Sequence, residues 1–536
     1  MKRDQKLEHA LQKVQKPGRY VGGELNSVVK DPSQVDVRFA FCFPDTYEIG
    51  MSHLGIKILY GAINQVPYFW CERAFAPWVD MEEEMRREGI PLYALESGDP
   101  VNRFDFIGFT LQYELSYTNV LNMLELAGIP LRSADRPDLF NIVVGGGPCA
   151  CNPEPLADFF DLFFLGDGEE VDVEVMELYR QCKKEGKSKL EFLEQAAQIE
   201  GVYVPAFYDV TYHEDGRVKA YTPTHGAPST VKKRAIMDMD KAYYPKDFVV
   251  PLIDVVHNRI SEEVLRGCIR GCRFCQAGFL YRPYREKSIE TIDRQCRDLC
   301  LSTGYDEISL SSLSTSDYVK LNELIDTLHQ WTEGEKVSLS LPSLRVDNFS
   351  PELMERINSV RKSGLTFAPE AGSQRMRDVI NKNVTEEELL HTVNVAFTEG
   401  WTRIKLYFMI GLPTETLEDV QAIVGLGQKV VDAFYANKEK PKGKGVEVSL
   451  SAAAFVPKPF TPFQWFGQDT MDTLQEKQRA LKGSPHSKRI SVSYHGAQTS
   501  FLDAVFARGD RRLCAVIEKA REFALRFGGW EDCFDF

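Results

Sequence analysis

The stretch from Arg266 to Cys275 decides the fold: it reads Arg-Gly-Cys-Ile-Arg-Gly-Cys-Arg-Phe-Cys. Its cysteines, Cys268, Cys272 and Cys275, have the spacing C-x3-C-x2-C, and Phe274 precedes the third. With 12 cysteines in 536 residues, chance gives about 0.006 such triplets per chain. Three thiolates from one loop can hold three irons of a 4Fe–4S cluster, whose usual ligands are cysteine thiolates. A fourth cysteine at matching spacing is absent, so one iron would be left open for chemistry.

A zinc site and inert buried thiols are the alternatives for this loop. Structural zinc normally takes four Cys or His ligands, often from paired C-x2-C knuckles. His257, upstream of Cys268, would have to be the fourth ligand. The other nine cysteines are scattered, and most are expected to be small buried hydrophobic residues.

The composition is that of a globular chain of two or three domains. Hydrophobic residues make up 43% and charged residues 26%, and the formal net charge is −14. This charge weakens a general nucleic-acid-binding interpretation, because phosphate contacts require clustered Lys and Arg. Arg508, Arg511 and Arg512 form one local cluster, either a solvated helix start or a contact for an anionic substrate. No apolar run is long enough for a bilayer and no secretory signal is recognisable, so we expect a cytoplasmic protein without a membrane partner.

The pattern of short apolar runs and amphipathic stretches predicts two successive α/β domains. We expect an N-terminal arm over 1–35, a first α/β domain over 36–200, a linker over 201–255, a second α/β domain over 256–465 and a small α+β extension over 466–536. In the first domain, the predicted strands are 37–43, 105–111, 141–144 and 162–165, with helices over 54–64 and 117–127. Their alternation indicates a parallel, doubly wound, Rossmann-like sheet.

The second α/β domain is predicted to be an open, partial (β/α)6 barrel. Its strands are expected at 263–265, 307–310, 337–341, 364–368, 403–409 and 447–455. Helices are expected at 351–361, 386–399 and 417–434, and a strand-like piece follows at 490–495. In such barrels the substrate lies at the C-terminal ends of the strands.

The cysteine motif resembles that of the radical S-adenosylmethionine (radical SAM) superfamily, and the resemblance covers roughly residues 261–463. It implies that the open iron chelates S-adenosylmethionine, whose reductive cleavage gives a 5′-deoxyadenosyl radical. It also implies that Phe274 packs near the adenine. An electron donor of the flavodoxin or ferredoxin type would be the partner.

Three further segments match motifs of this superfamily. The serine-rich loop 311–316, with Ser312 and Ser314, stands where many members carry Gly-Gly-Glu, which binds the methionine amino group. Glu370 stands at a position that contacts S-adenosylmethionine, and nearby Arg375 would pair with Glu370 or reach the methionine carboxylate. Gly411 and Pro413 belong to a Gly-Leu-Pro-Thr-Glu-Thr turn in which Thr replaces the usual Gly at 414. The resemblance assigns these segments to cofactor binding. Two more side chains, Arg345 and Lys405, are expected to point into the barrel, where Lys405 has either a functional or a paired structural role.

The first domain resembles the cobalamin-binding domain that precedes many radical SAM cores. The matching residues are Asp45, Ser116 and the triple glycine Gly145, Gly146 and Gly147. Such domains often carry Asp-x-His-x-x-Gly, whose His ligates cobalt, whereas this chain has Tyr47 in that place. His53 is nearby but out of register. Cobalamin therefore either binds without a protein imidazole or is not bound.

The resemblance implies a radical SAM enzyme that uses a 4Fe–4S cluster, S-adenosylmethionine and cobalamin to methylate an unactivated carbon. The catalytic residues and the substrate are not assigned. One alternative is a radical modification of RNA, a tetrapyrrole or a peptide without cobalamin, and another is a non-catalytic redox sensor. A methylthiotransferase is disfavoured, because Cys42, Cys71 and Cys149 match the pattern of its second cluster poorly.

Overall fold

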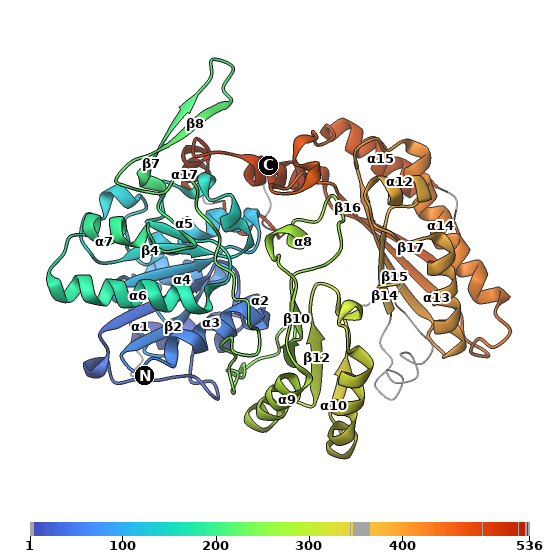
Figure 1. Cartoon of the computed structure of the whole chain (residues 1–536), viewed down its shortest axis with the longest axis horizontal. Coiled ribbons are helices and arrows are strands. Elements are labelled where there is room, and N and C mark those ends of the chain that lie inside the picture. Colours follow the sequence, from blue (N-terminus) through green and yellow to red (C-terminus); the bar gives the residue numbers. More distant parts are fainter. Residues whose placement is uncertain are drawn as a thin grey trace. The chain divides into compact units, whose positions relative to one another are not determined.

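The structure is a computed structural model that describes residues 5–342, 345–346, 365–484, 486–523, 525–530 and 533. It consists of two compact units (Figure 1). The first unit comprises 1–258, 298–304 and 509–536, and the second comprises 259–297 and 305–508. The predicted domain boundaries remain predictions. The units nevertheless assign the segment called a linker to the first unit and divide the C-terminal extension between both.

The first unit is built on a six-stranded sheet with the order β2-β1-β3-β4-β5-β6. Its strands are β1 (Val37–Phe43), β2 (Phe69–Phe75), β3 (Phe106–Thr110), β4 (Ile142–Gly146), β5 (Leu162–Phe164) and β6 (Val202–Tyr203). The first five are parallel, and β6 is antiparallel to β5. This order reverses direction between β1 and β3, which is the topological switch point where ligands bind in such sheets.

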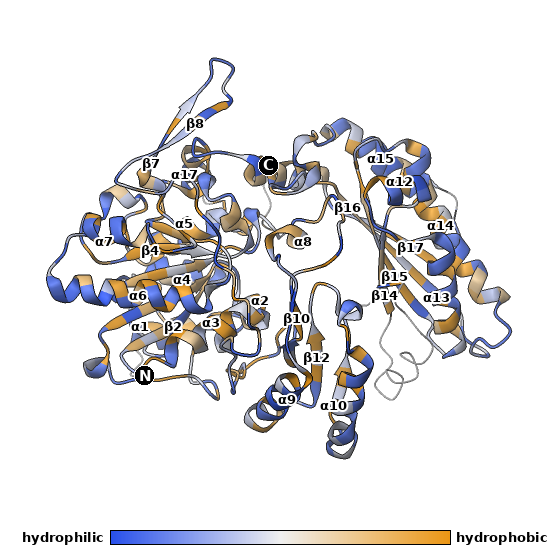
Figure 2. Cartoon of the chain, viewed as in Figure 1, coloured by the Kyte–Doolittle hydropathy of each residue, from blue (hydrophilic) through white to orange (hydrophobic). Residues whose placement is uncertain are grey.

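The helices of the first unit are α1 (Gln5–Leu11), α2 (Tyr47–Ser52), α3 (Leu54–Asn64), α4 (Val79–Glu88), α5 (Tyr117–Leu126), α6 (Gly168–Glu185), α7 (Lys189–Ala196) and α17 (Leu513–Glu522). The strands are predominantly hydrophobic, whereas α6 is hydrophilic over much of its length (Figure 2). A separate hairpin, β7 (Tyr208–Tyr212) and β8 (Val218–Pro223), projects from the unit. The alternation of strands and helices confirms the predicted doubly wound fold.

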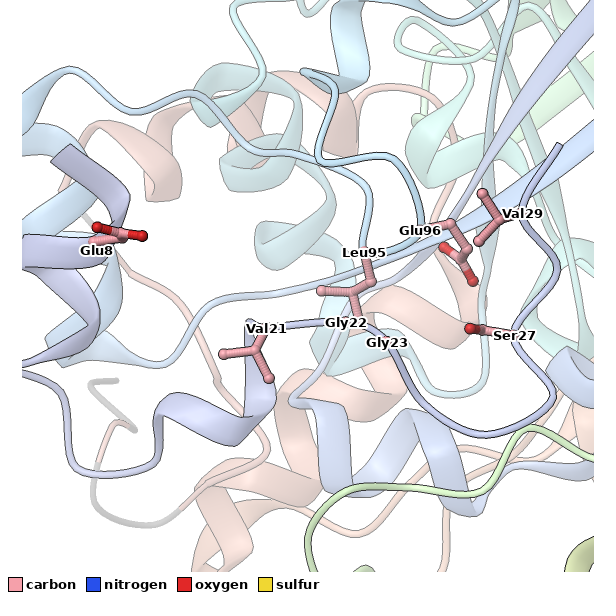
Figure 3. Close-up of a pocket in the computed structure, with 8 residues that line it drawn as sticks. All are labelled: Glu8, Val21, Gly22, Gly23, Ser27, Val29, Leu95 and Glu96. Atoms are coloured by element: carbon pink, nitrogen blue, oxygen red, sulfur yellow. The ribbon is translucent and has the colours of Figure 1, made fainter. Parts of the chain in front are cut away.

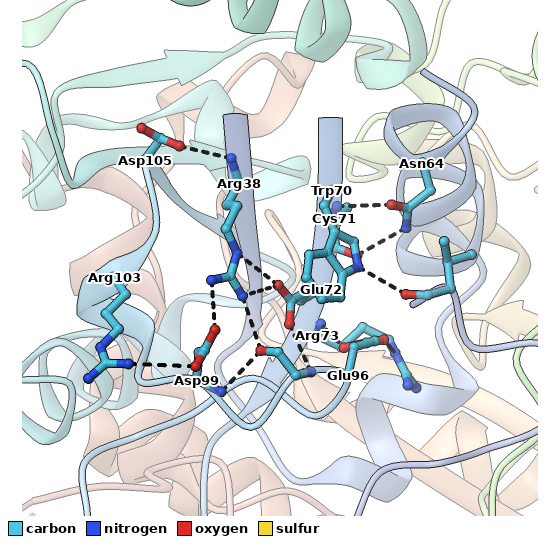
Figure 4. Close-up of polar contacts among 12 residues, drawn as sticks. Arg38, Asn64, Trp70, Cys71, Glu72, Arg73, Glu96, Asp99, Arg103 and Asp105 are labelled. Atoms are coloured by element: carbon cyan, nitrogen blue, oxygen red, sulfur yellow. Dashed lines mark hydrogen bonds and ion pairs between the residues drawn. The ribbon is translucent and has the colours of Figure 1, made fainter. Parts of the chain in front are cut away.

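The strand β2 carries charges into the sheet. Arg73 is 2% exposed and pairs with Glu96 at 2.6 Å and with Glu24 of the N-terminal arm at 3.1 Å. Arg38 of β1 pairs with Glu72 of β2 and Asp99, and Figure 4 shows this network. The network attaches the arm to the edge of the sheet through buried ion pairs.

The second unit holds the predicted barrel strands in two sheets. One has the order β13-β12-β9 and the other β14-β15-β16-β17, all parallel. The strands are β9 (Ile260–Glu263), β12 (Glu307–Ser311), β13 (Ser338–Ser340), β14 (Leu365–Glu370), β15 (Arg403–Ile410), β16 (Glu447–Ala454) and β17 (Ile490–Tyr494). The strand-like piece of the C-terminal extension is therefore a seventh parallel strand, paired with β16.

The helices of the second unit alternate with these strands. They are α8 (Ala277–Leu280), most of α9 (Ile289–Thr303), α10 (Leu321–Glu335), α12 (Gln374–Val379), α13 (Glu386–Thr398), α14 (Leu417–Ala436), α15 (Met471–Gly483) and α16 (Ala497–Arg508). The predicted helix 351–361 lies outside the described residues. Among the described helices, none combines the length and apolar composition that crossing a membrane requires.

Candidate functional site

The cysteine loop follows the short strand β10 (Leu265–Arg266), which pairs with β11 (Arg285–Glu286). Backbone N–H groups of Arg270 and Gly278 donate to the sulfurs of Cys268 and Cys275, both at 3.4 Å. Burial raises the pKa of the Cys272 thiol, and the positive charges of Lys382 and Arg345 oppose this shift. The loop therefore presents sulfur atoms that already accept hydrogen bonds, close to cationic side chains.

No group of three or more His, Cys, Asp or Glu side chains in the described ranges is arranged to hold a single metal ion. In a 4Fe–4S cluster, each cysteine binds a different iron, so the three sulfurs stand farther apart around the cluster. His257 belongs to the first unit, where its backbone N–H donates to Ser52 at 3.1 Å. The donor set thus fits a cluster with three protein ligands.

Two distant segments are hydrogen-bonded to the cysteine loop. The first segment is Ile380 and Asn381, directly after α12. Ile380 O accepts from the backbone N–H of Arg273 at 2.9 Å, and Asn381 Nδ2 donates to Gly271 O at 2.9 Å. From the proline-rich segment before α15, Phe463 N donates to Arg273 O at 3.2 Å. The loop is therefore held by segments far from it in sequence, as a preorganised site requires.

Glu370 lies at the end of β14 with a φ of +69°, in the left-handed region that is unusual for a non-glycine residue. Its Oε1 accepts from Lys382 Nζ at 3.1 Å, and Arg345 donates to the carbonyl of Lys382 at 3.1 Å. Burial raises the pKa of Glu370, while Lys382 and Arg345 lower it. The structure therefore brings Glu370, Lys382, Arg345 and Cys272 together.

The expected pairing of Arg375 with Glu370 is wrong. Arg375 lies in the first turn of α12, donates to Thr414 O at 2.8 Å and pairs with Asp419. Lys382 takes the place expected for Arg375. Lys382 follows α12 without any motif, so the sequence offered no signal for it.

The serine-rich loop after β12 is connected within itself and to the cysteine loop. Ser312 Oγ lies 2.9 Å from Thr315 Oγ1, and Ser314 Oγ donates to Asp317 at 2.7 Å. Asp317 in turn pairs with Arg270 between the first two cysteines. The predicted contact of Ser312 and Ser314 with S-adenosylmethionine remains a prediction, whereas Asp317 and Arg270 are structural members that sequence reasoning missed.

The turn after β15 holds Gly411 at a φ of +81°. A Cβ there would lie 2.9 Å from Leu474 of α15, so this close contact is one reason for glycine. The backbone N–H of Gly411 donates to Glu415 at 2.6 Å, and Glu415 pairs with Lys477 of α15 at 3.0 Å. The neighbouring Leu412 lies in an apolar cluster against which Phe274 packs. The turn is therefore held by α15. The predicted roles of Phe274, Gly411 and Pro413 at the adenine remain predictions.

In the first unit, the predicted cobalamin residues gather at the switch point of the sheet. Asp45 follows β1; its carboxylate accepts from Tyr113 Oη, from Thr46 N at 2.6 Å and from Trp530 Nε1 at 3.2 Å. Ser116 Oγ donates to Tyr113 O at 2.7 Å. Burial raises the pKa of Asp45, and the three hydrogen bonds lower it. Asp45 and Ser116 are therefore joined through Tyr113.

The triple glycine forms the end of β4 and the first residue after it, beside this set. A Cβ on Gly146 would lie 3.9 Å from the Cβ of Phe164, an ordinary contact distance, so packing does not require glycine here. Gly147 has a φ of +97°, and a Cβ there would lie 2.7 Å from Leu111 O. A Cβ on Gly145 would lie 2.8 Å from the ring of Phe163. Packing thus requires the two outer glycines but not the middle one.

Neither Tyr47 nor His53 is prepared to ligate a metal. Tyr47 is 1% exposed and its hydroxyl donates to Glu24 at 3.1 Å. His53 Nδ1 accepts from Ile56 N at 3.3 Å at the start of α3, and burial lowers the pKa of His53 to about 4. A neutral imidazole that accepts at Nδ1 carries its proton on Nε2 and has no lone pair left there.

The C-terminal segment also lies on the switch point. Phe527 N donates to Asn119 at 2.7 Å, and the ring of Trp78 lies 5.0 Å from Phe527 and 5.2 Å from Trp530. Gly529 stands against the ring of Tyr113. This segment carries no motif, and the sequence did not connect it with the site.

A concave region lies beside the N-terminal arm (Figure 3). It is a cavity of about 480 Å³ lined by Glu8, Val21, Gly22, Gly23, Ser27, Val29, Leu95 and Glu96. Glu96 is engaged by Arg73, so the cavity adjoins the buried ion pairs.

Both units match known protein families. Residues 263–427 match the model of the radical SAM superfamily, and residues 55–205 match that of the N-terminal region of radical SAM proteins. An uncharacterized protein of Methanocaldococcus jannaschii is 28% identical over 90% of this chain and 91% of its own length. An uncharacterized methyltransferase of Pyrococcus horikoshii is 24% identical over 47% of this chain and 53% of its own.

Two solved structures share the fold. The methyltransferase TsrM of Kitasatospora setae, solved with tryptophan and an analogue of S-adenosylmethionine, has a TM-score of 0.54 and 13% identity over 91% of this chain and 99% of its own. The cobalamin-dependent radical enzyme OxsB, solved with aqua-cobalamin and S-adenosylmethionine, has a TM-score of 0.54 and 14% identity over 91% of this chain and 71% of its own. The chain is a radical SAM enzyme whose N-terminal domain has the Rossmann-like fold of the cobalamin-binding type.

Proposed function

We propose that this protein is a cobalamin-dependent radical SAM methyltransferase that acts on an unactivated carbon. The observation that carries the proposal is the convergence of the three-cysteine loop with Glu370, Lys382 and Arg345 in the second unit. When bound, the cluster and S-adenosylmethionine supply a carbon-centred radical, and cobalamin supplies the methyl group. The cysteines would hold the cluster, and the charged residues beside them fit a ligand with both an ammonium and a carboxylate group.

The chain's own residues orient and enclose the cofactors. Lys382 and Arg345 are cations that would attract the methionine carboxylate, and Glu370 would accept from an ammonium or a ribose hydroxyl. Asp317 fixes Arg270 between two cysteines, and Lys477 fixes the Gly411 turn through Glu415. The site is held through side-chain pairs on both sides of the loop, which is how a buried site retains its geometry.

The switch point of the first unit fits a cobalamin that takes no imidazole from the protein. Gly146 at the end of β4 is not required by packing, and Asp45, Tyr113 and Trp530 supply polar groups there. An electron donor of the flavodoxin or ferredoxin type would be the redox partner of the second unit.

A second candidate function is radical modification without cobalamin. It is favoured by Tyr47, which is buried against Glu24, and by the C-terminal segment on the switch point. In that case the first unit is a scaffold.

The test is anaerobic purification from cells supplied with cobalamin, followed by iron, sulfide and cobalt analysis and an assay for 5′-deoxyadenosine. We expect a 4Fe–4S spectrum with stoichiometric cobalt, and loss of iron in Cys272→Ser. Cys300→Ser, on α9 outside the loop, is the matched control and should keep its iron. Iron without cobalt would support the second candidate, and zinc in place of iron would refute both.

A further inference from the structure

The inner wall of the second unit is lined with hydroxyl groups. Four of its strands carry a Ser-x-Ser pattern, at 309 and 311, 338 and 340, 449 and 451, and 491 and 493. Because side chains alternate along a strand, both serines of each pair lie on the same face. Ser311 is also the first residue of the serine-rich cofactor loop, and the other seven serines lie outside the cofactor motifs.

In the sheet β14–β17, the serine face is the one without helices. Leu406, Leu450 and Ile490 belong to the apolar core that also contains residues of α13 and α14. Ser449, Ser451, Ser491 and Ser493 alternate with those core residues along β16 and β17, so they lie on the opposite face.

The same holds in the sheet β13-β12-β9. Lys287 bonds both Glu262 of β9 and Gln295 of α9, each at 2.8 Å, so Glu262 faces the helices. The register places Glu262 beside Leu310, and Ser309 beside Ser261 and Ser340. The serines of β12 and β13 therefore lie on the helix-free face too. Right-handed β-α-β connections keep the helices on one side of such a series, so both helix-free faces belong to the inner wall.

This lining is unusual for a barrel, because closed β/α barrels fill their interior with bulky branched apolar side chains. Hydroxyls both donate and accept hydrogen bonds, and burying them without partners is costly. Ser491 Oγ and Ser449 Oγ bond each other at 3.1 Å, which leaves further donor and acceptor capacity on each. The wall therefore suits a ligand rich in hydroxyl or other polar groups.

Two cations of β15, Arg403 and Lys405, lie on the face of this wall. In the pairing register, Lys405 of β15 lies between Thr366 of β14 and Ser449 of β16, with Ser491 next in line. The only partner of Lys405 among the described residues is the ring of Tyr407, 4.6 Å from Nζ. The neighbouring Arg403, by contrast, pairs with Glu447 at 3.2 Å. Lys405 is thus an exposed cation beside hydroxyl groups, and no carboxylate of the described residues pairs with it.

The position of Lys405 also constrains the ligand's length. Gly411, at the carboxyl end of the strand, is six positions after Lys405, a span of about 20 Å. A molecule anchored at Lys405 must extend along the strand to bring a carbon to the end that carries the cofactor loops. An elongated ligand is favoured over a small free anion.

We propose that the substrate is a free nucleotide, whose phosphate binds Lys405 and whose hydroxyls bond the inner-wall serines. The inference rests on the proposed function, because it assigns the substrate class of the same radical site. A tetrapyrrole is disfavoured because its large apolar ring would leave these hydroxyls unpaired. RNA is disfavoured by the net charge of −14.

The probe is uridine 5′-monophosphate, titrated by saturation-transfer NMR into anaerobic, cluster-loaded protein saturated with S-adenosylmethionine. The bound S-adenosylmethionine keeps the probe out of the adenosine pocket. Lys405→Met should weaken binding about tenfold or more, as expected for a charge-assisted hydrogen bond. The double variant Ser449→Ala/Ser491→Ala should weaken it less, and Lys482→Met on α15 is the matched control that should bind like the native protein.

Two ligand controls complete the test. Uridine, which lacks the phosphate, should bind weakly and equally to native protein and Lys405→Met, and octanoate should not compete. Equal affinity of the probe for the two lysine variants, stronger binding of octanoate, or no binding of the probe would overturn the inference. Iron content and 5′-deoxyadenosine formation are measured separately. A protein that contains iron and forms 5′-deoxyadenosine but does not bind the probe refutes only the substrate class. A protein without iron refutes the proposed function, whatever ligand it binds.

Discussion

Thr414 is the residue whose backbone conformation conflicts most with its side chain. Its φ is +69°, and it occupies the position at which the corresponding turn of the radical SAM superfamily usually carries glycine. A β-branched residue in this region is strained by about 1–2 kcal/mol. Its neighbours at the site, Glu370, Asn381 and Phe460, also have positive φ values, so strain is concentrated around the cysteine loop.

Thr414→Gly should therefore raise the midpoint of thermal unfolding by a few degrees, since about 1 kcal/mol is released. Thr414→Ala is the control, because it removes the hydroxyl but keeps the Cβ and should give no gain. Differential scanning fluorimetry of the cluster-free protein measures both. Equal midpoints for the two variants would show that the backbone here is not strained by the side chain.

Asp419 couples the same turn to pH. Burial raises its pKa, but hydrogen bonds from Arg375, Ser373 and Thr416 outweigh burial and lower the pKa to about 2. Because the folded pKa is below that of the unfolded chain, the stabilisation is complete above about pH 4 and is lost as the pH falls toward 2.

Asp419→Asn should cost about 1–2 kcal/mol at neutral pH and flatten the acid limb of the stability profile. The measurement is urea unfolding of the cluster-free protein across this range, with exposed Asp432→Asn on the same helix as the control. An acid limb unchanged by Asp419→Asn would assign the loss to other carboxylates.

At the scale of elements, the sequence predicted strands wherever apolar residues were continuous. The range 37–43 coincides with β1, and 54–64 coincides with α3. It missed β2, because Glu72 and Arg73 interrupt the apolar pattern, and their partners Arg38, Glu96 and Glu24 are distant in sequence. The cofactor motifs were likewise visible because they are local, whereas Lys382 and Lys477 reach the site only through tertiary contacts.

The buried pair between Arg73 and Glu24 makes the N-terminal arm part of the first unit. Glu24→Gln leaves Arg73 with one carboxylate and should destabilise the unit by about 3 kcal/mol, since breaking a buried ion pair leaves a charge uncompensated. Arg512→Gln, which breaks an exposed pair with Asp510, is the control and should change the stability little, because solvent screens an exposed pair. Thermal unfolding followed by circular dichroism distinguishes the two. Similar midpoints would mean that the arm contributes little to the stability of this unit.

The C-terminal segment should respond to cobalamin. If corrin binds at the switch point, Trp530 must leave Asp45 and Trp78 or repack, and each lost contact costs about 1 kcal/mol. Trp530→Ala should then raise the association rate of hydroxocobalamin roughly tenfold, because the open state becomes more populated. Stopped-flow absorbance measures the rate, and exposed Trp465→Ala in the second unit is the control. A slower rate in Trp530→Ala would show that Trp530 is part of the pocket instead.

For the whole molecule, the first unit is completed by residues from the end of the chain. In α17, Cys514 and Ile517 are 1% and 0% exposed, and Arg511 pairs with Glu154 at 2.8 Å. Arg511 and Arg512, considered as an anion contact, are thus engaged in ion pairs, and Arg508 donates to Phe466 O at 2.8 Å. This basic cluster is structural in the described chain.

Truncation after residue 508 should therefore destabilise the first unit although it removes nothing from the radical SAM domain. The loss combines buried apolar side chains with an ion pair that leaves Glu154 alone beside Tyr203, so we expect several kcal/mol. Limited proteolysis should cut within 36–200 in the truncated chain, while deletion of 531–536 alone should preserve the native pattern. Equal resistance of both truncations would mean that the first unit folds without its C-terminal helix, and a cut confined to 259–508 would place the destabilisation in the second unit instead.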